Sequence, residues 1–160
     1  MKVPSKKATL LFLMKDEKIL LAMKKRGFGK GRWNGVGGKL ESGETIEEAA
    51  ARECQEEIGV TPLEYRRVAS LNFFFPTAKS EWDQQVLVYL CSKWQGEPTE
   101  TDEMKPEWYN INAIPYDNMW KDDKYWLPKV IKGNYVEAAF HFDDNDGVLS
   151  HEIRSEPGTT

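Results

Sequence analysis

The sequence predicts an α/β fold in which a mixed, curved β-sheet lies between helices. Two observations lead to this prediction. Several apolar runs, separated by glycine, proline and charged turns, have the length and composition of strands. Two other segments carry helix caps and good helix formers. A chain of 160 residues suffices for one domain, so we expect residues 1–154 to form a single domain and residues 155–160 to be a frayed tail.

The extended segments are predicted from apolar runs bounded by turn residues. The first two are joined by a charged turn and should form a hairpin, and the last two flank an Asn-Asp-Gly turn. The long strand after the first helix ends at Pro76. In chain order the expected extended segments are residues 6–14, 19–23, 33–37, 63–75, 84–94, 107–110, 135–142 and 148–153, with a helical turn at residues 111–114.

Two longer helices are predicted. Thr45 and Glu48 form a capping box at the start of the first helix, three consecutive alanines follow, and Gly59 supplies its stop. The second helix covers residues 122–132. Two aspartates in its first turn suit the helix dipole, and Pro128 is expected to kink it or to shift its start.

The first helix places acids where an ordinary surface helix would not. At about 100° per residue, Glu53 and Glu57 fall in the middle of the face that should be buried, and Glu56 lies at its edge. Carboxylates three and four residues apart repel one another, and burial increases that repulsion. A hard cation such as Mg²⁺ would resolve the conflict. The alternative, an amphipathic helix with excess acid, explains neither the acids on the apolar face nor the flanking glycines.

This stretch resembles the Nudix box, G-x5-E-x7-R-E-U-x-E-E-x-G-U, in which U is a bulky aliphatic residue. Every polar and glycine position of the pattern is present. Cys54 departs from the first U position, but a buried thiol behaves as a small hydrophobic side chain. The chain is therefore similar to the Nudix family, whose fold is a sheet between helices. The matching positions are Gly38, Glu44, Arg52, Glu53, Cys54, Glu56, Glu57, Gly59 and Val60.

The resemblance implies a metal-dependent hydrolase in which box carboxylates bind Mg²⁺, with Mn²⁺ as an alternative, and water attacks a phosphorus atom. By this resemblance Glu53 and Glu57 are the principal ligands, and the Gly37 carbonyl is a further ligand. Glu56 supports the cluster or binds a second ion. Glu103, outside the box, is either a ligand or the base that activates water. These four glutamates are the catalytic candidates.

The remaining polar positions of the box are expected to be structural. Arg52 should hold carboxylates in place, and Gly38 and Glu44 should support the loop and helix around it. Phosphoanhydride hydrolysis needs charge neutralisation, an oriented water and a base, and the acidic helix supplies the platform for the first of these.

Segments outside the box are similar to one subfamily, the animal-type MutT homologues, at residues 23–29, 31–35, 101–104 and 120–126. This resemblance implies hydrolysis of oxidised purine nucleoside triphosphates to monophosphate and pyrophosphate, which sanitises the nucleotide pool. The expected substrates are 8-oxo-dGTP and, as a further candidate, 2-hydroxy-dATP. Other Nudix activities stay open as alternatives, on methylated purine triphosphates, dinucleoside polyphosphates or nucleotide sugars. A non-catalytic nucleotide sensor is a further alternative, although a sensor would be expected to lose box acids.

Purine recognition requires a flat slot with hydrogen-bonding groups at its end. If Asp122 and Asp123 both face a dry pocket, repulsion and burial keep one of them protonated, so one donates while the other accepts. Such aspartates are otherwise helix caps, tryptophans are otherwise core residues, and Asn34 beside a glycine is otherwise a turn residue. The candidate substrate-binding residues are Thr9, Lys24, Phe28, Asn34, Phe73, Met104, Trp120, Asp122, Asp123 and Trp126.

Three departures from the subfamily pattern bear on substrate preference. Ala8 replaces a tyrosine, Asn72 replaces an aliphatic residue, and residues 83–85 are more polar than usual. Each is expected to make the site roomier or more polar.

Composition limits the partners. The net charge of −4 argues against broad binding to duplex nucleic acid, which relies on basic surface. No apolar run is long enough to span a membrane. Cys54 and Cys91 lie in hydrophobic segments, so two buried thiols are expected, which fits a reducing cytoplasm. We expect a cytoplasmic monomer that acts on a small nucleotide.

Overall fold

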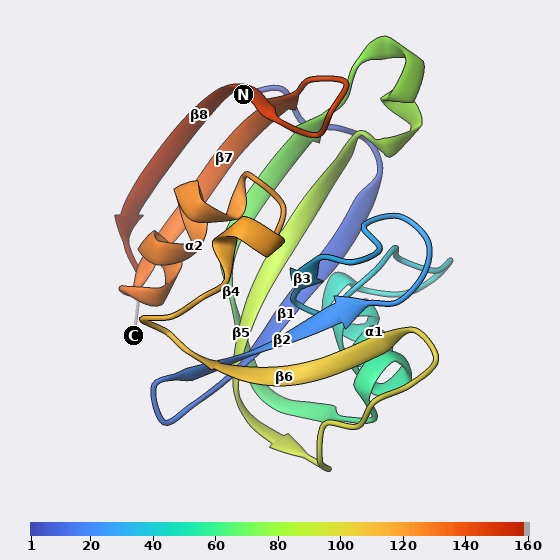
Figure 1. Cartoon of the computed structure of the whole chain (residues 1–160), viewed down its shortest axis with the longest axis vertical. Coiled ribbons are helices and arrows are strands. Elements are labelled where there is room, and N and C mark those ends of the chain that lie inside the picture. The colour runs from blue at the N-terminus through green and yellow to red at the C-terminus, as the bar shows by residue number, and fades with distance from the viewer. Residues whose placement is uncertain (159–160) are drawn as a thin grey trace.

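A computed structural model describes residues 1–158 (Figure 1). Within these residues the strands form one eight-stranded sheet in the order β3-β2-β1-β5-β4-β7-β8, and β6 pairs with β2. The strands are β1 (Lys7–Lys15), β2 (Lys18–Lys24), β3 (Trp33–Asn34), β4 (Thr61–Phe74), β5 (Gln84–Gln95), β6 (Met104–Asn110), β7 (Asn134–Phe142) and β8 (Val148–Pro157). The helices are α1 (Ile46–Ile58) and α2 (Asp123–Ile131), and the 3₁₀ turns are η1 (Thr77–Trp82) and η2 (Tyr116–Asn118).

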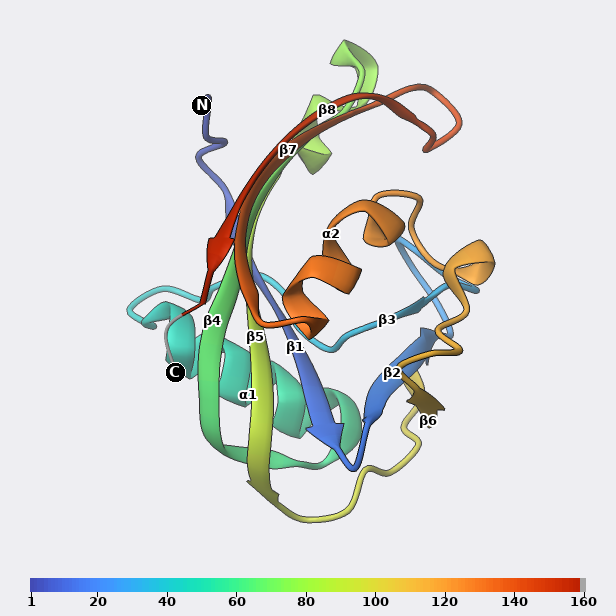
Figure 2. The same cartoon turned by 90° about the vertical axis from the view of Figure 1, so that its left-hand side faces the viewer.

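The sheet is mixed, as predicted. β1 runs parallel to β5 and β4 runs parallel to β7, whereas the remaining pairs are antiparallel. Figure 2 shows its strong curvature, with β7 and β8 bending over α2. The two helices cover opposite faces of the strands between them, which confirms the predicted α/β architecture.

Each helix closes a separate apolar core, and β1 contributes to both because alternate side chains of a strand point to opposite faces. Leu11 and Leu13 pack toward α1, with Cys54 and Ile58 of that helix. Phe12, between them in the sequence, packs toward α2 and the indole of Trp126, which is fully buried. The free thiols of Cys54 and Cys91 are both buried, as predicted.

The predicted helices lie where the caps placed them. The Thr45–Glu48 capping box is present, and Gly59 ends α1 in the left-handed conformation. α2 begins at the acidic pair and continues across Pro128, which does not displace its start. No helix within residues 1–158 is long and apolar enough to cross a membrane.

Three boundary predictions were wrong. β6 begins at Met104, earlier than the expected residue 107, because it pairs with β2 along its whole length. The helical turn expected at residues 111–114 is instead an irregular turn followed by η2. The tail expected to fray from residue 155 belongs to β8 as far as Pro157, where it pairs with Asn134 of β7. Residues 159–160 of that expected tail lie outside the described residues.

Candidate active site

A cavity of about 270 Å³ lies between the curved sheet, the glycine-rich loop of residues 27–32 and the start of α2. Its lining includes Gly37 and Gly38, which lead into the box, and the aspartate pair at the start of α2. All ten predicted substrate-binding residues line this one cavity: Thr9, Lys24, Phe28, Asn34, Phe73, Met104, Trp120, Asp122, Asp123 and Trp126.

On the α1 side, Glu57 is the buried acid. Its carboxyl group is only 3% exposed, and Oε1 accepts a hydrogen bond of 2.7 Å from the backbone N–H of Gly37. Burial, with a smaller contribution from the charges of Glu53 and Glu103, raises the pKa of Glu57 to about 8. The hydrogen bond from Gly37 and the charge of Lys24 act in the opposite direction.

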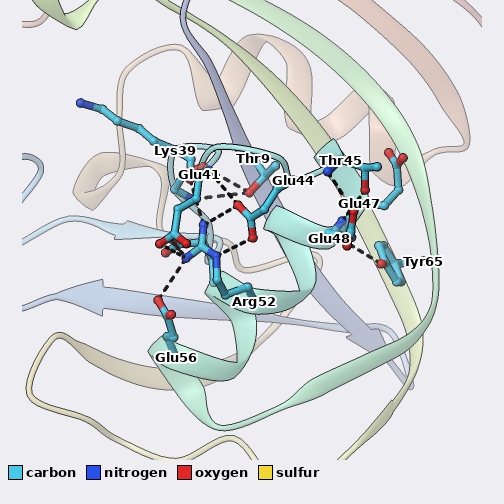
Figure 3. A network of polar contacts seen from close by, with 12 residues as sticks. Thr9, Lys39, Glu41, Glu44, Thr45, Glu47, Glu48, Arg52, Glu56 and Tyr65 are labelled. Atoms are coloured by element: carbon cyan, nitrogen blue, oxygen red, sulfur yellow. Dashed lines mark hydrogen bonds and ion pairs between the residues drawn. The ribbon is translucent and has the colours of Figure 1, made fainter.

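Arg52 organises the carboxylates on the outer side of α1 (Figure 3). Its guanidinium binds both oxygens of Glu44, with Nε donating at 2.7 Å and Nη2 at 3.0 Å. Nη1 donates to Glu53 Oε1 at 2.6 Å and to Glu56 Oε2 at 3.2 Å, and Nη2 also donates to the carbonyl oxygen of Lys39. One planar cation therefore ties the loop before α1 to two of the predicted metal ligands.

Glu53 lies against Gly38, the first glycine of the box, whereas Gly37 lies against β1. A Cβ atom added at Gly38 would lie 2.7 Å from the Glu53 carboxyl carbon, and one added at Gly37 would overlap the carbonyl oxygen of Thr9. Burial raises the pKa of Glu53, although its hydrogen bond from Arg52 lowers it. The glycines thus allow the loop backbone to approach the acidic helix closely.

Glu103 stands apart from the other three acids. Its side chain is half exposed and lies 3.6 Å from the guanidinium of Arg26. Like the three acids of α1, it does not itself line the cavity. Its charge still raises the pKa of both Glu53 and Glu57. Within residues 1–158, no three acid, histidine or cysteine side chains converge as a ready-made metal site. The structure therefore brings the predicted ligands into one neighbourhood but not into one coordination shell.

The residues present nevertheless suit a hard cation. The donors gathered here are carboxylate and backbone oxygens, which is the donor set of Mg²⁺ and Mn²⁺. The raised pKa values of Glu53 and Glu57 also indicate buried carboxylates whose negative charge is undercompensated. A divalent ion would supply that compensation.

At the other end of the cavity, Asp122 and Asp123 are each only 2% exposed. Asp122 makes no side-chain cap to α2; its Oδ2 instead accepts a hydrogen bond of 2.8 Å from the indole N–H of Trp126. Burial raises the pKa of Asp122 to about 6. Burial and the neighbouring Asp122 charge raise the pKa of Asp123 well above its ordinary value. The side-chain cap interpretation is therefore wrong for Asp122, and burial and mutual repulsion favour a proton on the aspartate pair.

Aromatic rings form the walls. Phe28 stacks on Trp82 with the ring centroids 4.0 Å apart and an interplanar angle of 8°, and its ring lies 5.0 Å from that of Trp120. Phe75 packs edge-on against Phe28 at 6.0 Å. The pocket is therefore a flat apolar slot that ends in hydrogen-bonding groups, the combination that suits a nucleobase.

Asn34 and Thr9 make hydrogen bonds and also line the cavity. Asn34 Oδ1 accepts from the backbone N–H of Gly35, so the turn interpretation and the cavity position both hold. Thr9 is buried against Gly38, whose backbone N–H lies 3.5 Å from the threonine hydroxyl. Lys24 lines the cavity on the side of Glu57.

Sequence reasoning missed several lining residues. Trp82 and Arg32 belong to segments without periodicity, so only their size and chemistry in otherwise polar loops could have drawn attention to them. Of the three departures, Ala8 and Gln84 do line the cavity. Asn72 does not: it points to the other face of β4 and donates to the Ala138 carbonyl oxygen. The other missed lining residues include Phe75 and Phe142.

Comparisons with known proteins agree with this geometry. A family model described as the NUDIX domain matches residues 4–130. An oxidized purine nucleoside triphosphate hydrolase of the mouse, Mus musculus, is 40% identical over 146 residues, which cover 91% of this chain and 92% of the mouse protein. The zebrafish protein of that name, from Danio rerio, is 40% identical over 149 residues, covering 93% and 94%. The crystal structure of a MutT protein from Bacillus halodurans superposes with a TM-score of 0.80 at 25% identity, covering 92% and 97%.

Proposed function

The chain belongs to the NUDIX domain family, and on that premise we propose that it hydrolyses oxidised purine nucleoside triphosphates to the monophosphate and pyrophosphate. One observation carries the proposal: a single cavity is lined both by Gly37 and Gly38, which contact Glu57 and Glu53 of the acidic helix α1, and by a buried aspartate pair among aromatic rings. The triphosphate would lie toward α1 and the base in the slot. The expected substrates are 8-oxo-dGTP and 2-hydroxy-dATP.

The aspartate pair supports recognition of an altered base edge. Asp122 accepts the Trp126 N–H and is therefore suited to be the ionised carboxyl, whereas burial and the neighbouring charge favour a proton on Asp123, which would then donate. Oδ2 of Asp123 has no hydrogen-bond partner within the described residues and is available to a base. A ring N–H of the base would meet Asp122 and a carbonyl oxygen would meet Asp123. Movement of the proton between the two carboxyls would admit a second edge pattern.

The acidic helix supports hydrolysis at the other end. Nudix hydrolases generally require a divalent metal. Glu53, Glu56 and Glu57 would hold Mg²⁺ together with the Gly37 carbonyl, and Glu103, the residue before β6, would contribute as a ligand or as the base. When bound, the ion supplies charge neutralisation for the phosphates.

Within this arrangement the protein's own groups orient the substrate and accept a proton. Lys24 would bind phosphate oxygens, and one of the glutamates would take the proton of the attacking water. Arg52 would keep Glu53 in position from outside the cavity.

The decisive experiment is a panel of kcat/KM values with Mg²⁺ and with Mn²⁺, using 8-oxo-dGTP, 2-hydroxy-dATP, a methylated purine triphosphate, dGTP and a dinucleoside polyphosphate. We expect the oxidised purines to exceed dGTP by at least about tenfold, because one well-matched buried hydrogen bond accounts for that ratio. The released product should be pyrophosphate. A preference for dinucleoside polyphosphates, or nucleotide binding without turnover, would replace this proposal by one of the alternatives.

Asp122→Asn and Asp123→Asn test the base-reading role directly. Each should change the ratio of kcat/KM between 8-oxo-dGTP and 2-hydroxy-dATP, because an amide cannot change between donor and acceptor by losing a proton. Asp117→Asn in η2 is the matched control: it removes the same charge from an exposed position outside the cavity. Unchanged ratios in both cavity variants would contradict the role.

A further inference from the structure

Trp120 forms a wall of the cavity, yet no regular element holds it. It lies in the connection between η2 and α2, and its ring is partly buried. A side chain in such a connection would ordinarily sample several rotamers. The surroundings of the indole must therefore set its orientation.

Two residues of the glycine-rich loop hold the Trp120 indole. A Cβ atom added at Gly29 would lie 3.3 Å from the indole nitrogen, so the loop backbone approaches the ring closely here, with Gly29 at a φ of +85°. The guanidinium carbon of Arg32 lies 4.0 Å from the centroid of the ring, in the stacked geometry that arginine favours on aromatic faces. Arg32 thus covers Trp120.

The position of Arg32 is set from a distant part of the chain. Its Nη2 donates a hydrogen bond of 3.1 Å to Oδ2 of Asp146, 114 residues further along the sequence in the turn between β7 and β8. The side chains of Arg32 and Asp146 are 32% and 26% exposed, so the ion pair is partly shielded from water.

The turn that carries Asp146 is well constrained. Oδ1 of Asp143 accepts hydrogen bonds from the backbone N–H groups of Asn145 and Gly147, and Asp146 itself has a φ of +61°. The same turn is bound to η1, because Lys79 Nζ donates to the carbonyl oxygen of Asp144 at 3.0 Å. Figures 1 and 2 both place η1 and this turn at the same end of the molecule.

We propose that Asp146 is a positioning residue for base binding: its carboxylate holds the Arg32 guanidinium against Trp120 and so fixes the tryptophan wall of the slot. The role rests on the proposed function, because the base is what the wall would contact. The β7–β8 turn thereby affects substrate affinity without touching the substrate. The phosphate end of the cavity, on the α1 side, is not involved.

The test is the affinity of the metal-free protein for 8-oxo-dGMP, measured by calorimetry, together with kcat and KM for 8-oxo-dGTP. Asp146→Asn should raise both Kd and KM about fivefold and leave kcat unchanged, the size expected for loss of an ordered cation–π contact. Asp146→Glu keeps the charge, so its Kd should lie closer to that of the unsubstituted protein than to that of Asp146→Asn. In an Arg32→Ala background, Asp146→Asn should have no further effect.

Asp144→Asn is the matched control, since it removes the same charge from the same turn. The Asp144 side chain is exposed and makes no hydrogen bond or ion pair within residues 1–158. The affinity of the Asp144→Asn variant for 8-oxo-dGMP should therefore equal that of the unsubstituted protein. Equal Kd values for Asp146→Asn and the unsubstituted protein, or additive effects with Arg32→Ala, would overturn the positioning role alone. Failure of the unsubstituted protein to bind 8-oxo-dGMP would overturn the proposed function as well.

Discussion

Two helices carry buried acids, α2 in the wall of the cavity and α1 behind the glycines that line it, and the negative charge is met differently in the two places. The acids of α1 meet nitrogen donors: Glu57 faces the N–H of Gly37, and Glu53 faces the guanidinium of Arg52. The acids of α2 lie side by side among aromatic rings, with the Trp126 indole as the donor to Asp122. Burial raises the pKa in both places.

The difference shows what each pair is suited to do. The α1 carboxyls lie beside a loop and half-exposed neighbours, where a divalent ion has access and would stabilise their ionised form. The α2 carboxyls are sealed in the slot, where a proton is the compensating charge. On the proposed function, the same residue type would serve charge neutralisation beside one part of the cavity and hydrogen-bond recognition in another.

The largest effect is expected where charge matters most. Glu57→Gln should lower kcat/KM at least about 1,000-fold, because loss of metal-assisted charge neutralisation costs several kcal/mol in the transition state. The Gln side chain can still accept from Gly37 N–H, so the fold should persist. Steady-state kinetics measures the loss of kcat/KM, and calorimetric titration with Mn²⁺ measures the loss of metal affinity.

Glu48→Gln is the control for that substitution. It removes one charge from the same helix at an exposed capping position and keeps an acceptor for the Thr45 N–H. It should retain activity. Full activity of Glu57→Gln, or of the unsubstituted enzyme after chelation of divalent ions, would show that the α1 acids do not work through a metal.

An intermediate effect is expected in the pH dependence of the free energy of unfolding. A carboxyl whose folded-state pKa is raised stabilises the fold fully below its unfolded value and loses that contribution as pH rises through the folded value. For Asp122 the window is therefore from about 3.8 to about 6. Relative to the unsubstituted protein, the Asp122→Asn Asp123→Asn double variant should gain at least about 2–3 kcal/mol between pH 4 and pH 7, because Asp122 alone accounts for that amount and Asp123 adds to it in the same direction.

Urea unfolding of the metal-free protein at several pH values measures this difference. Because Glu57 is present in both proteins, its own pH dependence cancels in the comparison. A constant difference across the range would mean that the two aspartates are not protonated by burial, and the contrast between the two helices would fail.

The smallest effect is expected at the mouth of the slot. Trp82→Leu should raise KM for purine triphosphates about threefold with little change in kcat, since a stacked aromatic pair contributes about 0.5–1.5 kcal/mol beyond its buried area. Trp94→Leu is the matched control, because Trp94 stacks on Trp108 away from the cavity. Equal changes in KM for both variants would show that Trp82 has no specific part in base binding.

The amino-acid sequence by itself determined the local features of this protein. The capping box, the left-handed Gly59 and the burial of Glu57 all follow from spacing within about 15 residues, because helix geometry converts spacing directly into direction. The ten proposed substrate-binding residues also lie together as expected, although that expectation came from resemblance rather than from spacing.

Tertiary structure decided what depends on partners far apart in the chain. The Phe28–Trp82 stack joins two loops without periodicity, and the Arg32–Asp146 pair joins residues 114 positions apart. Burial in the packed fold also decided a local choice: Asp122 accepts from the indole N–H of Trp126, four residues further on, instead of capping α2, because that buried donor requires an acceptor. Spacing can indicate which face of an element is buried, but only the packed fold sets which group meets it there.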